Sequence, residues 1–106
     1  MMSYNKTTLL KNLSCKDYFE LDYLYDVLDE CNALKNNYRE YMTTAPINCD
    51  EELLRLPDAD LDLCCALLTM LLREDHFCEG SFDRRQSRGQ VKLIIDRIIY
   101  LITTDN

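Results

Sequence analysis

The chain of 106 residues carries a net charge of −7, with 47% hydrophobic residues and only two Gly and two Pro. This length indicates a single domain, residues 1–106, with its own hydrophobic core, and the scarcity of Gly and Pro favours long helices. The acidic balance excludes generic binding to nucleic acid, which needs a basic surface.

The first 14 residues predict either a short helix or a loosely packed arm. Leu9, Leu10 and Leu13 are the only aliphatic anchors in this stretch. It lacks the continuous apolar segment of a secretory signal peptide, and no window of the chain reaches the ~20 apolar residues that span a bilayer. We therefore expect a cytoplasmic protein without a membrane segment.

A long amphipathic helix is predicted from Asp17 to about Met42. Apolar residues recur along it at alternating spacings of three and four, which places them on one face of a helix. The same geometry predicts a ridge of carboxylates on the opposite face, with tyrosines at its edges. The ridge residues that form a candidate partner site are Asp22, Asp26, Asp29, Glu40 and Tyr25. A solvated surface has the same composition, and a protein-binding surface is the functional alternative.

The helical pattern breaks at residues 43–49, where Pro46 disfavours helical backbone in the residue before it. Asn48 or Asp50 can then cap a short helix by accepting from its free N–H groups. Pro57 is expected to open the next helix, at a position where a missing N–H costs little.

The central helix of the fold is predicted at about residues 58–75. Between Leu61 and Leu72 only Asp62 and Thr69 interrupt an apolar run. A helix that is apolar on every side must be covered on every side. We therefore predict an all-α fold, a compact bundle of four to five helices around this buried segment.

Two more helical segments are expected after the central helix. Gly80 supplies a flexible or left-handed position, and Ser81 is expected to cap a short helix that ends near Gly89. The β-branched residues of the final segment, 90–103, would also suit a strand, but its apolar positions fit one face of a helix. We choose a helix, because a lone strand would leave its backbone groups without partners.

Six cysteines are spread through the chain: Cys15, Cys31, Cys49, Cys64, Cys65 and Cys78. We interpret them as buried free thiols rather than three disulfides, because the chain can form a sizeable apolar core without such bonds. His76 with Cys78 is a candidate for metal or thiol chemistry, but the chain has no pair of cysteines separated by two to four residues, the spacing that is usual in zinc sites. No phosphate-binding glycine loop or serine nucleophile motif occurs. We therefore expect no enzymatic activity, no metal and no cofactor.

The net charge is distributed unevenly. Residues 1–63 contain 6 Lys or Arg and 13 Asp or Glu, whereas residues 64–106 contain 6 of each. The second part has a cationic cluster of Arg84, Arg85 and Arg88. This cluster is expected either to pair with nearby carboxylates or to contact a partner, because three arginines on an acidic protein make a poor nucleic-acid site.

The segment 67–101 contains an ordered signature: an Arg that ends an apolar helix, a Phe-Cys-Glu-Gly run, a later Gly and a final amphipathic helix. Its members are Arg73, Phe77, Cys78, Glu79, Gly80 and Gly89. This order resembles the C-terminal signature of a small bacterial and phage family of unknown function. The resemblance implies a helical fold and an origin in a bacterium, phage or mobile element, and it implies no activity. Where that family has an Arg before the Phe, this chain has His76.

The signature also has a physical interpretation that needs no family. Arg73 at the end of the central helix would interact favourably with the helix dipole. Phe77 would fold back onto the core, and Gly80 would let the chain reverse. We therefore expect structural roles for these residues and for Cys78.

These observations favour a non-enzymatic protein that binds a protein partner with a basic surface. An inhibitor from a phage or mobile element, acting on a nucleic-acid-binding effector of a defence system as anti-CRISPR proteins do, is the most concrete form of this hypothesis. A helical homodimer with a structural or regulatory role is the alternative, and a metal- or thiol-dependent enzyme is the second alternative. Direct binding to nucleic acid or to a membrane is not expected.

Overall fold

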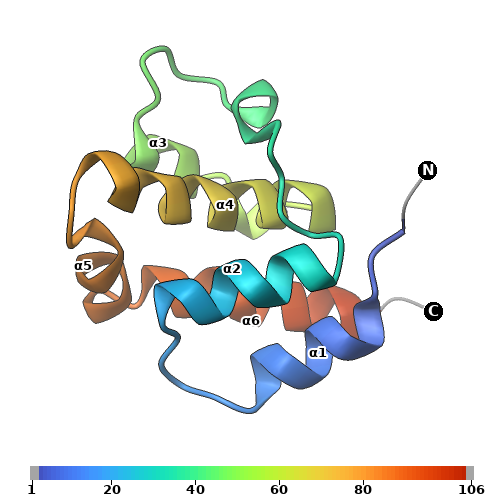
Figure 1. Ribbon diagram of the computed structural model, residues 1–106. Coiled ribbons are helices and arrows are strands. Elements are labelled where there is room, and N and C mark those ends of the chain that lie inside the picture. The colour runs from blue at the N-terminus through green and yellow to red at the C-terminus, as the bar shows by residue number, and fades with distance from the viewer. Residues whose placement is uncertain (1–2, 105–106) are drawn as a thin grey trace.

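The computed structural model describes residues 3–104, and its regular elements there are all helices (Figure 1). Their bounds in chain order are α1 Lys6–Ser14, α2 Leu21–Glu30, the 3-10 helix η1 Tyr38–Tyr41, α3 Cys49–Leu53, the 3-10 helix η2 Leu56–Asp58, α4 Leu61–Phe77, α5 Ser81–Ser87 and α6 Gln90–Thr104. The predicted all-α class is confirmed, with six α-helices in the described residues instead of the four to five expected.

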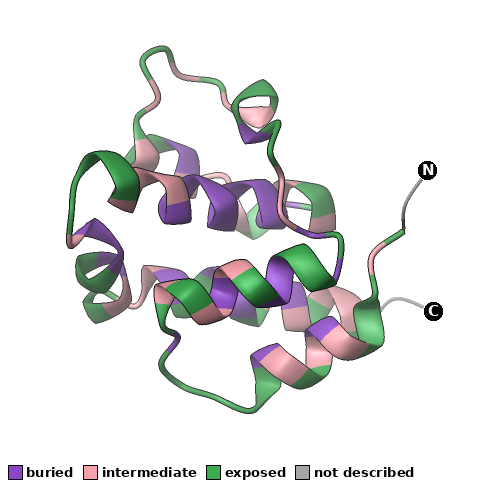
Figure 2. Cartoon of the chain, in the orientation of Figure 1, coloured by how far each residue is buried: buried purple, intermediate pink, exposed green. Residues whose placement is uncertain are grey.

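The central helix predicted from the sequence is α4. Every side chain from Cys64 to Leu72 is buried, and Figure 2 shows the buried residues gathered along the middle of this helix. The elements α3 and η1 lie on one side of α4, and α2 and α6 lie on the other (Figure 1). α4 begins later than predicted because Asp60 caps it, accepting from the N–H of Leu63 at 2.8 Å. Pro57 belongs to η2 and does not open α4.

Both ends of the described chain pack onto this core. On α6 the buried face contains Val91, Ile94, Ile95 and Ile98, which confirms helix rather than strand for this segment. α1 packs against α6 and α2, with Leu9 and Leu13 buried. Of the two alternatives for the N-terminal stretch, the structure has the short helix.

The predicted helix Asp17–Met42 is wrong in length. α2 ends at Glu30, and the chain turns at Asn32, whose φ of 60° is left-handed. A left-handed residue just past a helix is a common stop signal, and Asn tolerates this conformation better than most residues.

The sequence pattern hides this break because the segment after the turn is itself buried on one side. Cys31, Ala33 and Tyr38 all belong to the core. The backbone N–H of Lys35 donates to the buried Thr69 hydroxyl at 3.1 Å, which fixes the irregular segment to α4. The helix-like spacing of apolar residues therefore continues past Glu30, although the helix ends there.

The six cysteines all lie within residues 3–104, and all are free thiols. The predicted burial holds for Cys31, Cys64 and Cys65 and is wrong for Cys15 and Cys78, which are exposed. Burial raises the pKa of both Cys64 and Cys65 to about 12. These two thiols stay protonated near neutral pH and pack as small apolar groups.

None of the helices in the described part of the chain is both long enough and apolar enough to cross a bilayer.

Candidate functional site

A cavity lies on each side of the C-terminal part of α4. The first, of about 580 Å³, lies between the segment that leads into α2 and the turn from α4 to α5; we name it the acidic cleft. The second, of about 560 Å³, lies between η1, the loop before α3 and α4; we name it the apolar pocket. The neighbouring residues Glu74 and Asp75 line different cavities, because successive helical residues point about 100° apart.

Polar contacts between residues 15–20 and α5 hold the acidic cleft together. The Tyr18 hydroxyl donates to Asp83 at 2.9 Å. The Phe19 N–H donates to the Gln86 side-chain oxygen at 3.0 Å, and the Gln86 amide nitrogen donates back to the Phe19 carbonyl. Phe19 itself is buried in the core. The wall of the cleft is therefore fixed by a buried ring and a reciprocal amide pair.

The opposite wall is the turn between α4 and α5. Gly80 has a φ of 87°, the left-handed conformation expected from the sequence. The Asp75 carboxylate accepts from the N–H of Gly80 at 3.0 Å and from that of Phe82 at 3.1 Å. Gly80 also occupies the N-cap position of α5, so the predicted capping by Ser81 is wrong.

Five carboxylates line the acidic cleft, and the lining contains neither Lys nor Arg. They are Glu20, Asp22, Asp75, Glu79 and Asp83. The ion pairs within residues 3–104 involve other carboxylates, so these five are not neutralised by a cation in the described part of the chain. Like charges around a concave, low-dielectric surface concentrate a negative potential there.

The predicted carboxylate ridge exists only in part. Asp22, Asp26 and Asp29 are exposed along α2, as their helical spacing predicts. Glu40 is exposed on η1, beyond the turn at residue 32, so the four carboxylates do not share one helix face. Of the four ridge carboxylates, only Asp22 is among the residues that line the acidic cleft.

Tyr25, the remaining ridge residue, is half-buried beneath a cation. The guanidinium carbon of Arg73 lies 5.5 Å from the centre of its ring, and Arg73 also donates to the Asn36 side chain at 3.1 Å. Arg73 does not end α4, which continues to Phe77. Instead, it attaches α2 and the following segment to the C-terminal part of α4.

Phe77 does not fold back onto the core, and this prediction is wrong. Its side chain is 75% exposed. Phe77 is the last residue of α4, beyond the buried run that ends at Leu72, and it lines the apolar pocket together with Met70. Cys78 is also exposed, and its sulfur accepts from Arg84 at 3.3 Å.

Arg85 connects four helices through its side-chain hydrogen bonds. It is buried, and its Nε and Nη2 donate to the two oxygens of Glu74 at 3.0 and 2.8 Å. Its Nη1 donates to Asp50 and, at 3.2 Å, to Gln90. These hydrogen bonds from Arg85 lower the pKa of both Glu74 and Asp50. Of the two alternatives stated for the arginine cluster, Arg85 therefore has the pairing with nearby carboxylates.

The other two members of the arginine cluster, Arg84 and Arg88, are exposed. Their place on the surface is compatible with the predicted contact to a partner.

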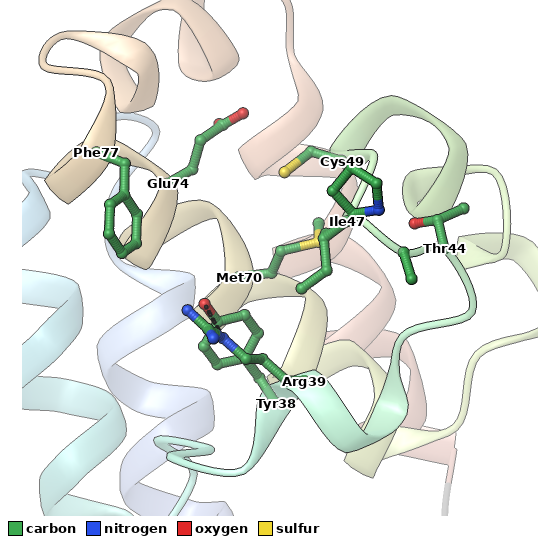
Figure 3. A pocket seen from close by; sticks show the side chains of 10 residues that line it. Tyr38, Arg39, Thr44, Ile47, Cys49, Met70, Glu74 and Phe77 are labelled. Atoms are coloured by element: carbon green, nitrogen blue, oxygen red, sulfur yellow. Dashed lines mark hydrogen bonds between the residues drawn. The ribbon is translucent and has the colours of Figure 1, made fainter.

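Apolar side chains form most of the apolar pocket (Figure 3). They are Tyr38, Ala45, Pro46, Ile47, Met70 and Phe77. Its polar lining residues are Arg39, Thr44, Cys49 and Glu74. In Figure 3 the Arg39 and Tyr38 side chains lie on the opposite side of the pocket from Cys49.

A buried carboxylate holds the loop that forms one wall of this pocket. Glu52 accepts from the N–H of Thr43 at 3.0 Å, from the N–H of Thr44 at 2.8 Å and from Arg55 at 2.8 Å. Burial alone would raise the pKa of Glu52, but hydrogen bonds from the Thr44 hydroxyl, Arg55 and the backbone outweigh burial and lower it to about 2. Glu52 is therefore ionised in the fold at all but strongly acidic pH.

The thiol in the apolar pocket is a poor nucleophile. Burial, together with the neighbouring Glu74 carboxylate, raises the pKa of Cys49 to about 12. The thiolate is the reactive form, and Cys49 holds very little of it near neutral pH. Within residues 3–104, no three His, Cys, Asp or Glu side chains are grouped so that they could hold a metal ion.

Sequence reasoning missed Glu20, Asp75, Glu79 and Asp83 as members of one site. The three around the α4–α5 turn are visible as a local cluster of carboxylates. Their meeting with residues 18–22 depends on the buried Phe19 and on the Gln86 contact, which no local pattern signals.

The fold and its cavities define a small all-helical domain whose central helix ends between an acidic cleft and an apolar pocket. The family model described as a family of unknown function, DUF6508, matches residues 12–104. The chain therefore belongs to this family. A search of the curated proteins finds no match, and neither does a search of the solved structures.

Proposed function

We propose that this protein is a non-enzymatic binding protein whose acidic cleft receives cationic side chains from a partner protein with a basic surface. The observation that carries this proposal is the convergence on one concave surface of five carboxylates that form no ion pair with any residue from 3 to 104. Such an arrangement favours binding of Lys or Arg side chains and speeds their approach.

The side chains around the cleft suit Arg in particular. Tyr18 offers an exposed ring whose hydroxyl is held by Asp83, and a guanidinium can stack on such a ring while it pairs with neighbouring carboxylates. Glu20 lies on one wall of the cleft, before α2, and Glu79 lies on the opposite wall, in the turn between α4 and α5. A cation between them would pair with both sides of the cleft.

Nucleic-acid-binding effectors are one class of protein with basic surfaces of this kind. A cytoplasmic inhibitor that covers such a surface, as an anti-CRISPR protein from a phage or mobile element does, is the specific form of the function that we propose. Arg84 and Arg88 are the next candidates for contacts with the same partner, since both are exposed and follow the cleft residue Asp83 along the chain.

The test uses two variants that each remove three negative charges. The cleft variant combines Glu20→Gln, Asp22→Asn and Glu79→Gln, and it keeps Asp75 and Asp83, which hold the turn and Tyr18. The control variant combines Asp26→Asn, Asp29→Asn and Glu40→Gln, which are exposed carboxylates outside the cleft.

A hexa-arginine peptide is titrated into each protein by calorimetry at low and at high salt. We expect the cleft variant to lose affinity by about tenfold and the control variant by about threefold or less, since exposed charge pairs are worth up to ~1 kcal/mol each. Equal losses in the two variants would show that only the net charge matters, and that the cleft is not a site.

An apolar patch supports a second candidate function, a helical homodimer with a structural or regulatory role. Leu54 on the segment after α3 is 78% exposed and Leu93 on α6 is 59% exposed, and both line a cavity of about 360 Å³. Leucines this exposed side by side are typical of protein contacts. Mass measurement in solution tests this candidate, with Leu54→Gln and Leu93→Gln expected to convert a dimer to a monomer.

A further inference from the structure

The apolar pocket has the dimensions and lining of a small-molecule site, and the proposed binding of a basic partner does not use it. Its volume of about 560 Å³ falls in the range of ligand cavities, which are mostly apolar with a few polar groups that fix orientation. Tyr38, Ile47, Met70 and Phe77 form much of its wall (Figure 3). Phe77 is 75% exposed, so an apolar ligand in the pocket would remove its ring from water, which is favourable.

One cation is available at this pocket, although the whole protein is acidic. Arg39 is the only cation in the lining, and it forms no ion pair with a carboxylate of residues 3–104. The Tyr38 hydroxyl, 3.4 Å from its Nε, steadies the guanidinium beside the pocket. An unpaired guanidinium next to an apolar cavity presents a fork of donors that matches a carboxylate.

The one carboxylate in the lining does not cancel this charge. Both oxygens of Glu74 accept from the buried guanidinium of Arg85, so this carboxylate is already paired with a cation other than Arg39. The Cys49 thiol on the far side of the pocket is uncharged, because its pKa is raised to about 12. An incoming ligand therefore meets apolar walls and a single available cation.

We propose that the apolar pocket binds a small organic carboxylate with an aliphatic or aromatic body. The body lies against Phe77, Met70 and Ile47, and the carboxylate accepts hydrogen bonds from the guanidinium of Arg39. Neutral and cationic molecules of the same shape bind less well, because they leave Arg39 without a counter-ion.

The experiment uses 8-anilinonaphthalene-1-sulfonate, an aromatic anion whose fluorescence increases in an apolar site, as the reporter. It is titrated into the wild-type protein and then displaced by decanoate or by decanol, which have the same chain length and differ in the charged head. We expect decanoate to displace the reporter at a concentration about tenfold lower than decanol, the size of one charge-assisted hydrogen-bonded pair.

Two variants locate the site. Arg39→Gln is expected to remove the preference for decanoate over decanol while leaving decanol competition unchanged, and Phe77→Ala is expected to weaken both competitors. Both positions are exposed, so the fold should persist, and far-UV circular dichroism checks this. Arg88→Gln, an exposed arginine outside the pocket, is the control and should behave as the wild type.

Equal competition by decanoate and decanol in the wild-type protein would overturn the proposal. Decanoate preference that persists in Arg39→Gln would overturn it as well, since another cation would then be responsible.

Discussion

The acidic cleft and the apolar pocket differ most in the hydrogen-bond partners of two adjacent carboxylates, Glu74 and Asp75. Glu74 faces the pocket, and both of its oxygens accept hydrogen bonds from the buried Arg85. Asp75 faces the cleft and accepts only backbone N–H groups, from Gly80 and Phe82. Two consecutive residues of α4 therefore face different cavities, one whose carboxylate is paired with a cation and one whose carboxylates are not. Buried pairing, rather than the local density of acidic residues, decides which cavity is negative.

Removing Arg85 is the strongest way to abolish this difference. Arg85→Ala would leave the half-buried Glu74 without its counter-ion, and loss of one partner from a buried ion pair costs about 3–5 kcal/mol of unfolding free energy. Urea denaturation followed by circular dichroism measures the loss. Arg88→Ala is the matched control and should change stability by less than about 0.5 kcal/mol, because Arg88 is exposed. Similar losses in both variants would contradict the anchoring role.

Acid should destabilise the loop that forms one wall of the apolar pocket. The pKa of Glu52 is lowered from its ordinary value of 4.5 to about 2, so the fold favours its ionised form. Its contribution to stability is complete above pH 4.5 and is lost as the pH falls from 4.5 towards 2. Urea denaturation across this pH range should show a falling midpoint.

The variant Glu52→Gln tests the origin of this pH dependence. Its unfolding free energy at pH 7 should fall by roughly 2–3 kcal/mol, because a buried, multiply hydrogen-bonded carboxylate is replaced. The dependence on pH between 4.5 and 2 should become shallower than in the wild type. An unchanged slope would mean that other carboxylates dominate acid unfolding.

On the cleft side a smaller effect is expected. Asp75→Ala removes the acceptor for the Gly80 and Phe82 N–H groups, and loss of a cap of this kind costs ~1 kcal/mol. Thermal unfolding should show the decrease. Asp83→Ala, which loses a hydrogen bond from the Tyr18 hydroxyl but no backbone contact at the turn, should destabilise less, and the reverse order would contradict the capping role.

The smallest effect is expected on the outer face of α2. Asp26→Asn and Asp29→Asn change exposed carboxylates that form no ion pair within residues 3–104. Their stability should stay within about 0.5 kcal/mol of the wild type. A larger loss by thermal unfolding would show that the helix needs these charges.

The sequence predicts those parts of the fold that depend on periodicity within one helix. The apolar run at residues 61–72 and the one-sided apolar pattern at residues 90–103 both fold as helices, α4 and α6, with the burial that these patterns predict. The reversal at Gly80 follows from the conformational freedom of glycine. In each case, residues near in sequence are enough to determine the structure.

The rest depends on contacts between distant residues. Nothing local distinguishes Arg85 from Arg84 and Arg88, since the difference lies in Asp50 and Glu74, which belong to other helices. The end of α2 was missed because the residues after Asn32 are also buried. The acidic cleft likewise joins two segments that the sequence separates by more than fifty residues.

Arg85 also has a consequence for the order in which the molecule opens. Its contacts connect α5 to Asp50 on α3, Glu74 on α4 and Gln90 at the start of α6. α3 has only five residues, too few to be stable as an isolated helix. Its backbone amides should therefore exchange with solvent in step with those of α5, as one cooperative unit, because opening either helix breaks the same ionic contact.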